Sequence, residues 1–211
     1  MRAAVLLSGI IVTLLASGCG GQPQPPDILV PPRLDVRHFG RVGLVTFTVE
    51  NAKGTLHQYA TTRFAEGVLA AQPGVEVLEV GAMDTLQQRL GESEFGIESA
   101  QALGKAHNVP AVFVGHLKVS NPTMSGGLNG LAPHLESTVR MDLAVQLLST
   151  ADGGTLWRSS AWASEQVGEI SLGGGELEFG AKDPEKAYGH IVGRLVRLVT
   201  QDMYATWERP Q

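Results

Sequence analysis

The stretch Ala111-Val-Phe-Val-Gly-His-Leu-Lys-Val119 decides the fold of this chain. It opens on an apolar run rich in Val and Phe, and then alternates between apolar and polar side chains. This pattern predicts a strand that is buried on both faces at its start and on one face later. Helix-period sequence precedes the stretch and period-two sequence follows it. We therefore expect a central strand where a strand-and-helix half of the domain meets a hairpin half.

The chain before the central strand alternates between strand and helix patterns. β-branched or alternating residues predict strands at residues 41–49 and 75–80. Apolar residues at helical spacing predict helices in residues 55–72, 84–91 and 97–106. Thr55 and Asp84 each precede a Gln by three residues and are predicted to form capping boxes. The third helix is expected to turn four residues toward the core: Ile97, Ala100, Leu103 and Ala106.

The chain after the central strand reads as strands followed by one helix. Residues 120–133, broken by Gly and Pro, predict a long exposed loop. Residues 137–149 and 155–164 predict two antiparallel strands joined by a turn, and residues 167–179 a small flexible hairpin. The last helix is predicted to start at Asp183-Pro184. Its apolar stripe comprises Ala187, Ile191, Leu195, Leu198, Val199 and Met203.

This order, β-α-β-α-α-β-β-β-α, predicts a fold of the α/β to α+β class, a mixed sheet with helices packed on it. The predicted single globular domain covers residues 41–209. Residues 20–41 are Pro-rich with few apolar side chains, so we expect residues 19–40 to form an extended tether with a reach of about 50–60 Å.

Residues 1–18 have the layout of a secretory signal peptide, with Arg2 followed by an apolar run of about 14 residues that is too short for a permanent transmembrane helix. The run ends in Leu-Leu-Ala-Ser-Gly before Cys19 and resembles a bacterial lipobox. The resemblance implies cleavage before Cys19, lipidation including palmitate on that residue, and sorting to the outer membrane, because Gly20 and not Asp follows it. The alternative is an ordinary secretory signal that leaves Cys19 free.

Composition and motifs argue against several function classes. The 16 Lys and Arg residues are outnumbered by 21 Asp and Glu and form no basic block, so nucleic acid is not an expected partner. Cys19 is the single cysteine, so it can form neither an intramolecular disulfide nor a cysteine metal site. Ser159, Ser160 and Ser171 lack a nucleophile elbow, and the glycine runs lack the features of a phosphate-binding loop. We expect no enzyme activity and no cofactor.

The histidines and two of the tryptophans are further candidate site residues. The histidines have no metal-ligand spacing and are expected to be exposed or at helix ends: His38, His57, His107, His116, His134 and His190. Trp157 and Trp162 lie five residues apart on one predicted strand and should face opposite sides. Packing in the core is favoured for them over a role as binding anchors.

Three segments, residues 42–47, 100–115 and 139–157, resemble the corresponding parts of a group of bacterial envelope proteins. The group includes the curli secretion lipoprotein CsgG, the LpoB activators of penicillin-binding proteins and the amino-terminal domain of TolB. The resemblance covers about residues 41–205. It implies a fold shared with activators, pore subunits and docking domains, and supplies no catalytic residue.

The sequence therefore predicts a lipoprotein of the cell outer membrane, held by lipid on Cys19 with its domain facing the periplasm. Its expected role is that of a non-catalytic accessory, docking or activator protein for another envelope component, as a monomer or small homo-oligomer. One alternative is a glycan-binding domain or enzyme of the cell wall that uses residues 120–133 and 167–179 as a cleft. A second is a CsgG-like secretion-pore subunit, disfavoured because these two segments leave little room for membrane-spanning hairpins.

Overall fold

The structure, a computed structural model, describes residues 26–52, 54–82, 95–121, 123–129, 132–173, 176–180 and 184–209. The predicted signal peptide, Cys19 and the helix predicted at residues 84–91 lie outside these ranges. None of the helices in the described ranges is long and apolar enough to cross a membrane.

Strand β5, Ala111–Val119, is the central strand that the sequence predicts. It runs parallel to β2, Arg41–Thr46, on one side and antiparallel to β7, Ala132–Ser149, on the other. Its first five residues are buried, and from there His116 and Lys118 are exposed whereas Leu117 and Val119 are buried. The predicted change from two buried faces to one is therefore confirmed.

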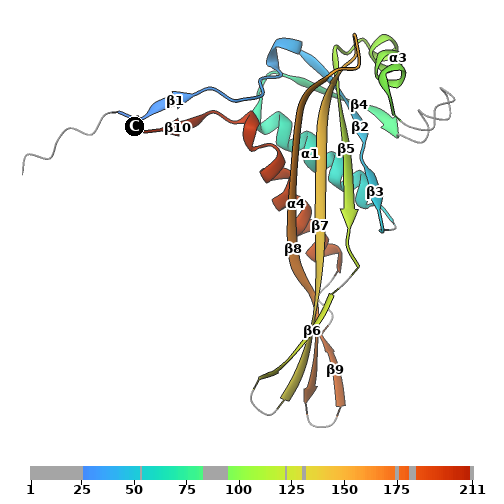
Figure 1. The fold of residues 1–211 in the computed structure, drawn as a ribbon, viewed down its shortest axis with the longest axis vertical. Coiled ribbons are helices and arrows are strands. Elements are labelled where there is room, and N and C mark those ends of the chain that lie inside the picture. Colours follow the sequence, from blue (N-terminus) through green and yellow to red (C-terminus); the bar gives the residue numbers. More distant parts are fainter. Residues whose placement is uncertain are drawn as a thin grey trace, which may run out of the picture.

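The main sheet has eight strands among the described residues and is mixed (Figure 1). Its order is β4-β2-β5-β7-β8-β9, with β3 beside β5 and β6 beside β7. The bounds of the remaining strands are β3 Thr48–Glu50, β4 Glu76–Ala82, β6 Thr123–Asn129, β8 Thr155–Gly173 and β9 Glu176–Gly180. The pairs β2–β4 and β2–β5 are parallel, and the strands from β5 to β9 are antiparallel. The mixed sheet of the α+β class is thus confirmed.

Two helices, α1 (Leu56–Ala71) and α4 (Pro184–Val199), cover one face of the sheet and close the main core. Phe113 of β5 contacts Phe64 of α1 with ring centroids 5.1 Å apart, and Trp157 of β8 at 6.2 Å. Ile191 and Leu195 of α4 are fully buried in the same core, as the helical stripe predicts. Two residues of the predicted stripe differ: Leu198 is exposed, and Met203 is buried but lies in a 3₁₀ turn after the end of α4.

The shorter helix α3, Ile97–His107, lies against the opposite face of the sheet at one end. Ala100 and Leu103 are buried there as predicted, but the prediction is wrong for Ile97, which is 58% exposed, and for Ala106, which is also exposed. Ile97 instead lies over the turn between β7 and β8, within 2.8 Å of where a Cβ of Gly153 would be. Because this face carries only a small apolar cluster, the buried stripe of α3 is narrow.

The structure corrects the predicted long loop at residues 120–133. Strand β6 and the start of β7 occupy most of it and pair from Thr123↔Thr138 to Asn129↔Ala132. Strand β8 continues beyond the predicted residue 164 to Gly173 and pairs with β9, so the hairpin predicted at residues 167–179 is confirmed. The loop prediction failed because Gly126 and Gly127 carry no side chain that would show alternation, so backbone pairing alone defines the strand. The cleft hypothesis assumed two loops, whereas both segments contain paired strands.

Two local predictions in the first strand and helix are also wrong. Residues 41–49 form two strands, because the chain breaks at Phe47, whose N–H donates to Thr61 Oγ1 at 2.8 Å and not to a neighbouring strand. Thr55 is the N-cap of α1, but its side chain makes no capping hydrogen bond, so the capping box is absent.

The segment before β2 belongs to the fold in part. Strand β1, Ile28–Val30, pairs with β10, Thr206–Glu208, in a separate two-stranded sheet. Leu34 and Val36 are buried in the main core, and single turns of 3₁₀ helix follow at Arg37–Phe39 and, near the other terminus, at Gln201–Met203. The folded part of the chain therefore begins before residue 41.

Candidate docking surface

Among the described elements, only α3 packs on the sheet face opposite α1 and α4, and the rest of that face is uncovered. The register places residues of one parity from β5, β7 and β8 on it. Lys118, Asp142 and Trp162 lie directly opposite one another across these three strands, and His116, Ala144 and Ser160 form the next row. We call this face, together with Glu50 of β3 and Arg140 of β7, the open sheet face.

On strands β7 and β8 of the open sheet face, an ion pair lies beside an exposed aromatic ring. Arg140 donates from Nη2 to Asp142 Oδ1 at 2.7 Å and from Nε to Asp142 Oδ2 at 3.1 Å. The Arg140 guanidinium lies 4.5 Å from the centroid of the Trp162 ring, which is a cation–π contact. These hydrogen bonds to the Asp142 carboxylate raise the pKa of Arg140 above its ordinary value. Trp162 nevertheless remains 59% exposed.

A second charged group lies along the β3–β5 edge of the same face. Lys118 Nζ is 2.9 Å from Glu50 Oε1, and His116 Nε2 is 3.5 Å from Glu50 Oε2. His116 Nδ1 is 2.8 Å from Thr48 Oγ1, which fixes the ring between two strands. The hydrogen bond from Lys118 holds the pKa of the Glu50 carboxyl below its ordinary value.

The open sheet face is suited to recognition by a flat partner. Its side chains are anchored on paired strands, and bidentate pairing restricts the Arg140 side chain before any partner binds. Trp and Arg are the residue types that most often dominate the binding energy of protein interfaces. Its acidic groups are paired with basic ones, whereas Arg158 donates to the neutral Gln146, so the face carries charges of both signs.

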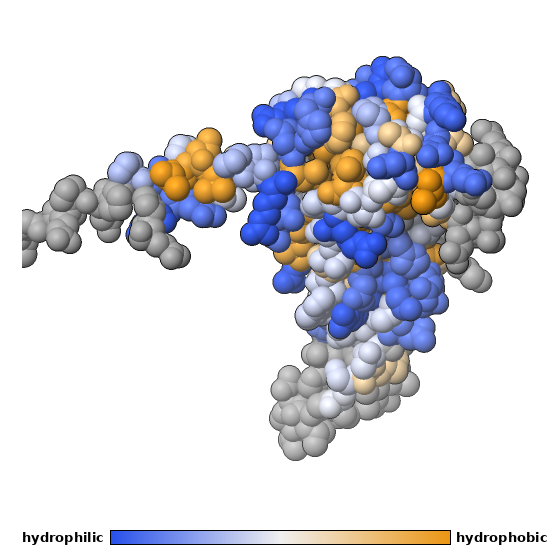
Figure 2. All heavy atoms as spheres, turned by 45° about the horizontal axis from the view of Figure 1, so that its top comes forward, coloured by the Kyte–Doolittle hydropathy of each residue, from blue (hydrophilic) through white to orange (hydrophobic). Residues whose placement is uncertain are grey.

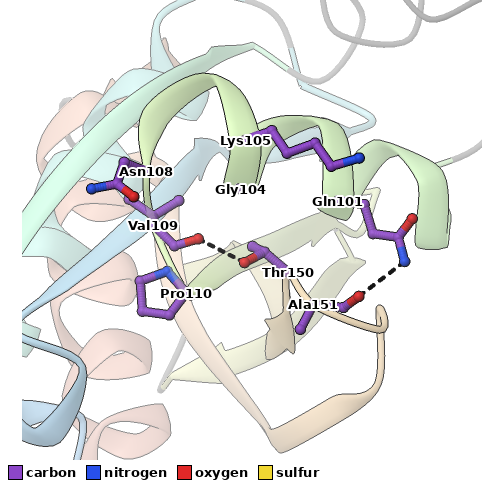
Figure 3. Close-up of a pocket in the computed structure, with 8 residues that line it drawn as sticks. All are labelled: Gln101, Gly104, Lys105, Asn108, Val109, Pro110, Thr150 and Ala151. Atoms are coloured by element: carbon purple, nitrogen blue, oxygen red, sulfur yellow. Dashed lines mark hydrogen bonds between the residues drawn. The ribbon is translucent and has the colours of Figure 1, made fainter.

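A shallow cavity of about 520 Å³ lies where α3 meets the turn between β7 and β8 (Figure 3). Thr150 Oγ1 donates to the carbonyl of Val109 at 2.6 Å, and Gln101 Nε2 donates to the carbonyl of Ala151 at 3.0 Å. These bonds join α3, and the turn between α3 and β5, to the turn between β7 and β8. Gly104 allows this approach, because a Cβ there would overlap Thr150. We interpret the cavity as a gap that remains where α3 packs against the β7–β8 turn, and not as a binding site.

The residues considered from the sequence lie apart in the structure. Trp157 packs toward the core and Trp162 lies on the open sheet face, so the prediction of opposite sides is confirmed and one of the two is exposed. His190 is 3.4 Å from Glu165, and His38 stacks on Phe39. Within the described ranges, no group of three His, Cys, Asp or Glu residues could hold a metal ion.

Sequence reasoning missed the open sheet face as a unit. Alternation alone assigns Arg140 and Asp142 to the outward side of one strand and Lys118 to the outward side of another. Their juxtaposition with Trp162 depends on the register of three strands. The signal that could have found it is the pairing of residues 137–149 with 155–164 around the turn at Gly153, extended to the central strand.

No protein-family model matches the sequence, and comparison with curated proteins finds no relative. Among solved structures, the PelC dodecamer from Paraburkholderia phytofirmans is similar at 14% identity and a TM-score of 0.43, over 85% of this chain and 99% of that chain. Lipoprotein GNA1162 from Neisseria meningitidis is similar at 14% identity and a TM-score of 0.39, over 60% of this chain and 83% of that chain.

The LpoB C-terminal domain from Escherichia coli is similar at 15% identity and a TM-score of 0.34, over 59% of this chain and 82% of that chain. The similar structures thus include a bacterial lipoprotein and a domain of a protein in the group that the sequence resembles. At these identities and TM-scores, the likenesses carry no argument about what this chain does.

Proposed function

We propose that this chain is a lipoprotein of the outer membrane, anchored through lipid on Cys19, whose periplasmic domain is a non-catalytic accessory protein that docks another envelope protein through the open sheet face. The observation that carries the proposal is the exposed Trp162 held beside the Arg140–Asp142 pair. The lipobox-like sequence before Cys19 supplies the compartment and the anchor. The lack of a catalytic motif in the sequence supports a docking role over an enzymatic one.

The geometry favours a protein over a glycan as the partner. A sugar ring stacks on an open aromatic face, whereas the Arg140 guanidinium already lies over the Trp162 ring. A protein partner can bury the remaining ring surface and extend the hydrogen bonds of the two ion pairs. One observation favours the pore-subunit alternative, since the hairpins β6–β7 and β8–β9 extend beyond the body (Figure 1). However, β6 has 7 residues and β9 has 5, which is shorter than the about 9–11 residues of a membrane-spanning strand. Ring-shaped particles of the lipidated protein in electron microscopy would support that alternative.

The docking proposal predicts that Trp162→Ala weakens partner binding by about 30-fold, since truncation of a central Trp costs about 2 kcal/mol or more in interfaces. A photo-crosslinking residue at the exposed Ser160, in the next row, should capture the partner in cells, and Trp162→Ala should strongly reduce that yield. Binding of the captured partner to the purified domain then gives the affinity.

Arg158→Ala is the matched control, because Arg158 is exposed on the same strand and face but contacts Gln146 and not Trp162. We expect it to change the affinity by less than about threefold, as for a rim residue. Equal losses in Trp162→Ala and Arg158→Ala, or crosslinks that remain after Trp162→Ala, would refute the docking proposal.

The anchoring proposal predicts that Cys19→Ser releases the domain from membranes while its fold is kept. Two acyl chains hold a protein stably at a bilayer, and the substitution removes the thiol that carries the lipid. The measurement is fractionation after a high-salt wash, with circular dichroism of the released protein. A Cys19→Ser protein that remains with the membranes would show that the anchor lies elsewhere.

A further inference from the structure

The two-stranded sheet of β1 and β10 projects from the body as an arm (Figure 1). The strands are antiparallel, with Leu29 opposite Trp207 and Ile28 opposite Glu208. Alternation along both strands therefore places Leu29 and Trp207 side by side on one face, and Asp27 and Arg209, whose charged groups are 3.7 Å apart, beside them on that face.

The arm exposes large apolar side chains that the fold does not use. Ile28 is 52% exposed, Leu29 is 55% exposed and Trp207 is 68% exposed. Figure 2 shows hydrophobic residues gathered on the arm, separated from the body. An isolated two-stranded ribbon is at best marginally stable in water, so a surface that covers these side chains would stabilise it.

The root of the arm is fixed to the body on both strands. After β1, Leu34 and Val36 enter the core, and before β10, Met203 is fully buried. The N–H of Leu34 donates to the carbonyl of Asp202 at 3.0 Å, which ties the two roots together. The apolar end of the arm therefore lies away from the core, and its large side chains remain exposed.

The position of the single cysteine limits how far the arm could lie from a bilayer that holds a lipid anchor. Nine positions separate Cys19 from Ile28, and a fully extended chain spans at most about 3.3–3.6 Å per residue, so lipid on Cys19 keeps the arm within about 30 Å of the bilayer. Trp is enriched at membrane interfaces because its ring is apolar and its N–H polar, and Arg209 beside it can reach the headgroup region. Arg209 is paired with Asp27, and Glu208 adds one negative charge, so the arm has no excess of positive charge that would require anionic lipid.

We propose that the β1–β10 arm lies on the bilayer that holds the lipid anchor, with Leu29 and Trp207 in its interfacial region. This inference rests on the proposed lipidation of Cys19. The arm then acts as a second, weak contact that sets the orientation of the domain, and the open sheet face keeps a defined direction relative to the membrane.

Quenching of tryptophan fluorescence by brominated phospholipid tests the proposal. The lipidated full-length protein is inserted into phosphatidylcholine and phosphatidylethanolamine vesicles with and without brominated acyl chains. We expect clear quenching in the unmodified protein and loss of at least about two thirds of it in Trp207→Phe. The matched control is Trp162→Phe, because Trp162 is similarly exposed but lies on the open sheet face, and the quenching should remain.

The outcomes separate the arm from the anchor. A protein that sediments with the vesicles but shows no quenching, or equal quenching in Trp207→Phe, would overturn the arm proposal and leave the anchor intact. Quenching that disappears in Trp162→Phe would show that the open sheet face contacts the lipid, and this would also overturn the arm proposal. If acrylamide and brominated lipid both failed to quench the fluorescence of Trp207, the arm would instead be covered by a second copy of the chain, and the proposal would be overturned. A protein that does not sediment would overturn both proposals.

Discussion

Gly115→Ala is expected to lower the free energy of unfolding by about 3 kcal/mol, because the new Cβ would overlap the ring of Phe47. Gly115 lies in the middle of β5, the strand between the parallel and antiparallel halves of the sheet. Both residues are buried, and Phe47 is held in turn by the ring of Phe64 at 5.3 Å. Neither the strand nor the ring can therefore move without disturbing its other neighbours. Chemical denaturation monitored by circular dichroism measures the change.

Two further variants make the test specific. Phe47→Leu should recover part of the loss in the Gly115→Ala background, because a smaller side chain gives room to the new methyl group, and the two substitutions should couple by about 1 kcal/mol or more. Gly193→Ala is the control with the same chemical change, since a Cβ at Gly193 in α4 meets nothing within 4 Å. It should stabilise the protein by about 0.5–1 kcal/mol. A loss below about 1 kcal/mol in Gly115→Ala would contradict the packing argument.

The central strand could be predicted from sequence because its burial follows directly from its pattern. In Ala111–Val119 the polarity of each side chain matches its burial. Apolar residues on both faces indicate a strand in the interior of the sheet. The contact between Gly115 and Phe47 could not be predicted in the same way. It requires the break after β2, and that break depends on the hydroxyl of Thr61, which reaches the N–H of Phe47 from a helix turn. Local sequence contains no sign of this partner.

The length of the hairpin strands was missed for a different reason. Residues 120–133 contain Gly and Pro at positions where turns are common, and the strand in them is defined by backbone pairing with β7. In the same way, the pattern at residues 155–164 predicts the paired part of β8 over the core, where burial imposes alternation. Beyond the core no buried face imposes it, so the continuation to Gly173 carries little signal.

The candidate sites also differ in whether local sequence is enough to predict them. Cys19 is recognised from a local motif, whereas the open sheet face joins residues of four strands that are distant in sequence. Alternation assigns each of them to an outward position but does not align Lys118, Asp142 and Trp162 in one row. The arm was missed because β1 and β10 have three residues each and come from opposite ends of the chain. The Pro-rich composition around β1 indicated an extended segment and gave no hint of a partner strand.

Gln72→Leu is expected to cost about 3–5 kcal/mol, a large effect for a residue whose sequence context indicates only the end of a helix. Gln72 is 1% exposed and joins three parts of the chain. Its Oε1 accepts from the N–H of Val36 at 3.2 Å, and its Nε2 donates to the carbonyls of Leu34 and Met203. Leucine fills a similar volume but leaves these three buried backbone groups without their partner, at about 1–3 kcal/mol for each unsatisfied group.

The loss should be greatest at the roots of the arm, because Leu34 follows β1 and Met203 precedes β10. Hydrogen exchange of the amides in Ile28–Val30 and Thr206–Glu208 should therefore accelerate more than that of the central strand, and chemical denaturation should give the total. Gln101→Leu is the matched control, since Gln101 makes one exposed hydrogen bond to the carbonyl of Ala151, and it should cost less than about 1 kcal/mol. Equal costs for the two variants would mean that the Gln72 amide does not hold the arm to the body, because burial and the number of partners are what distinguish the two positions.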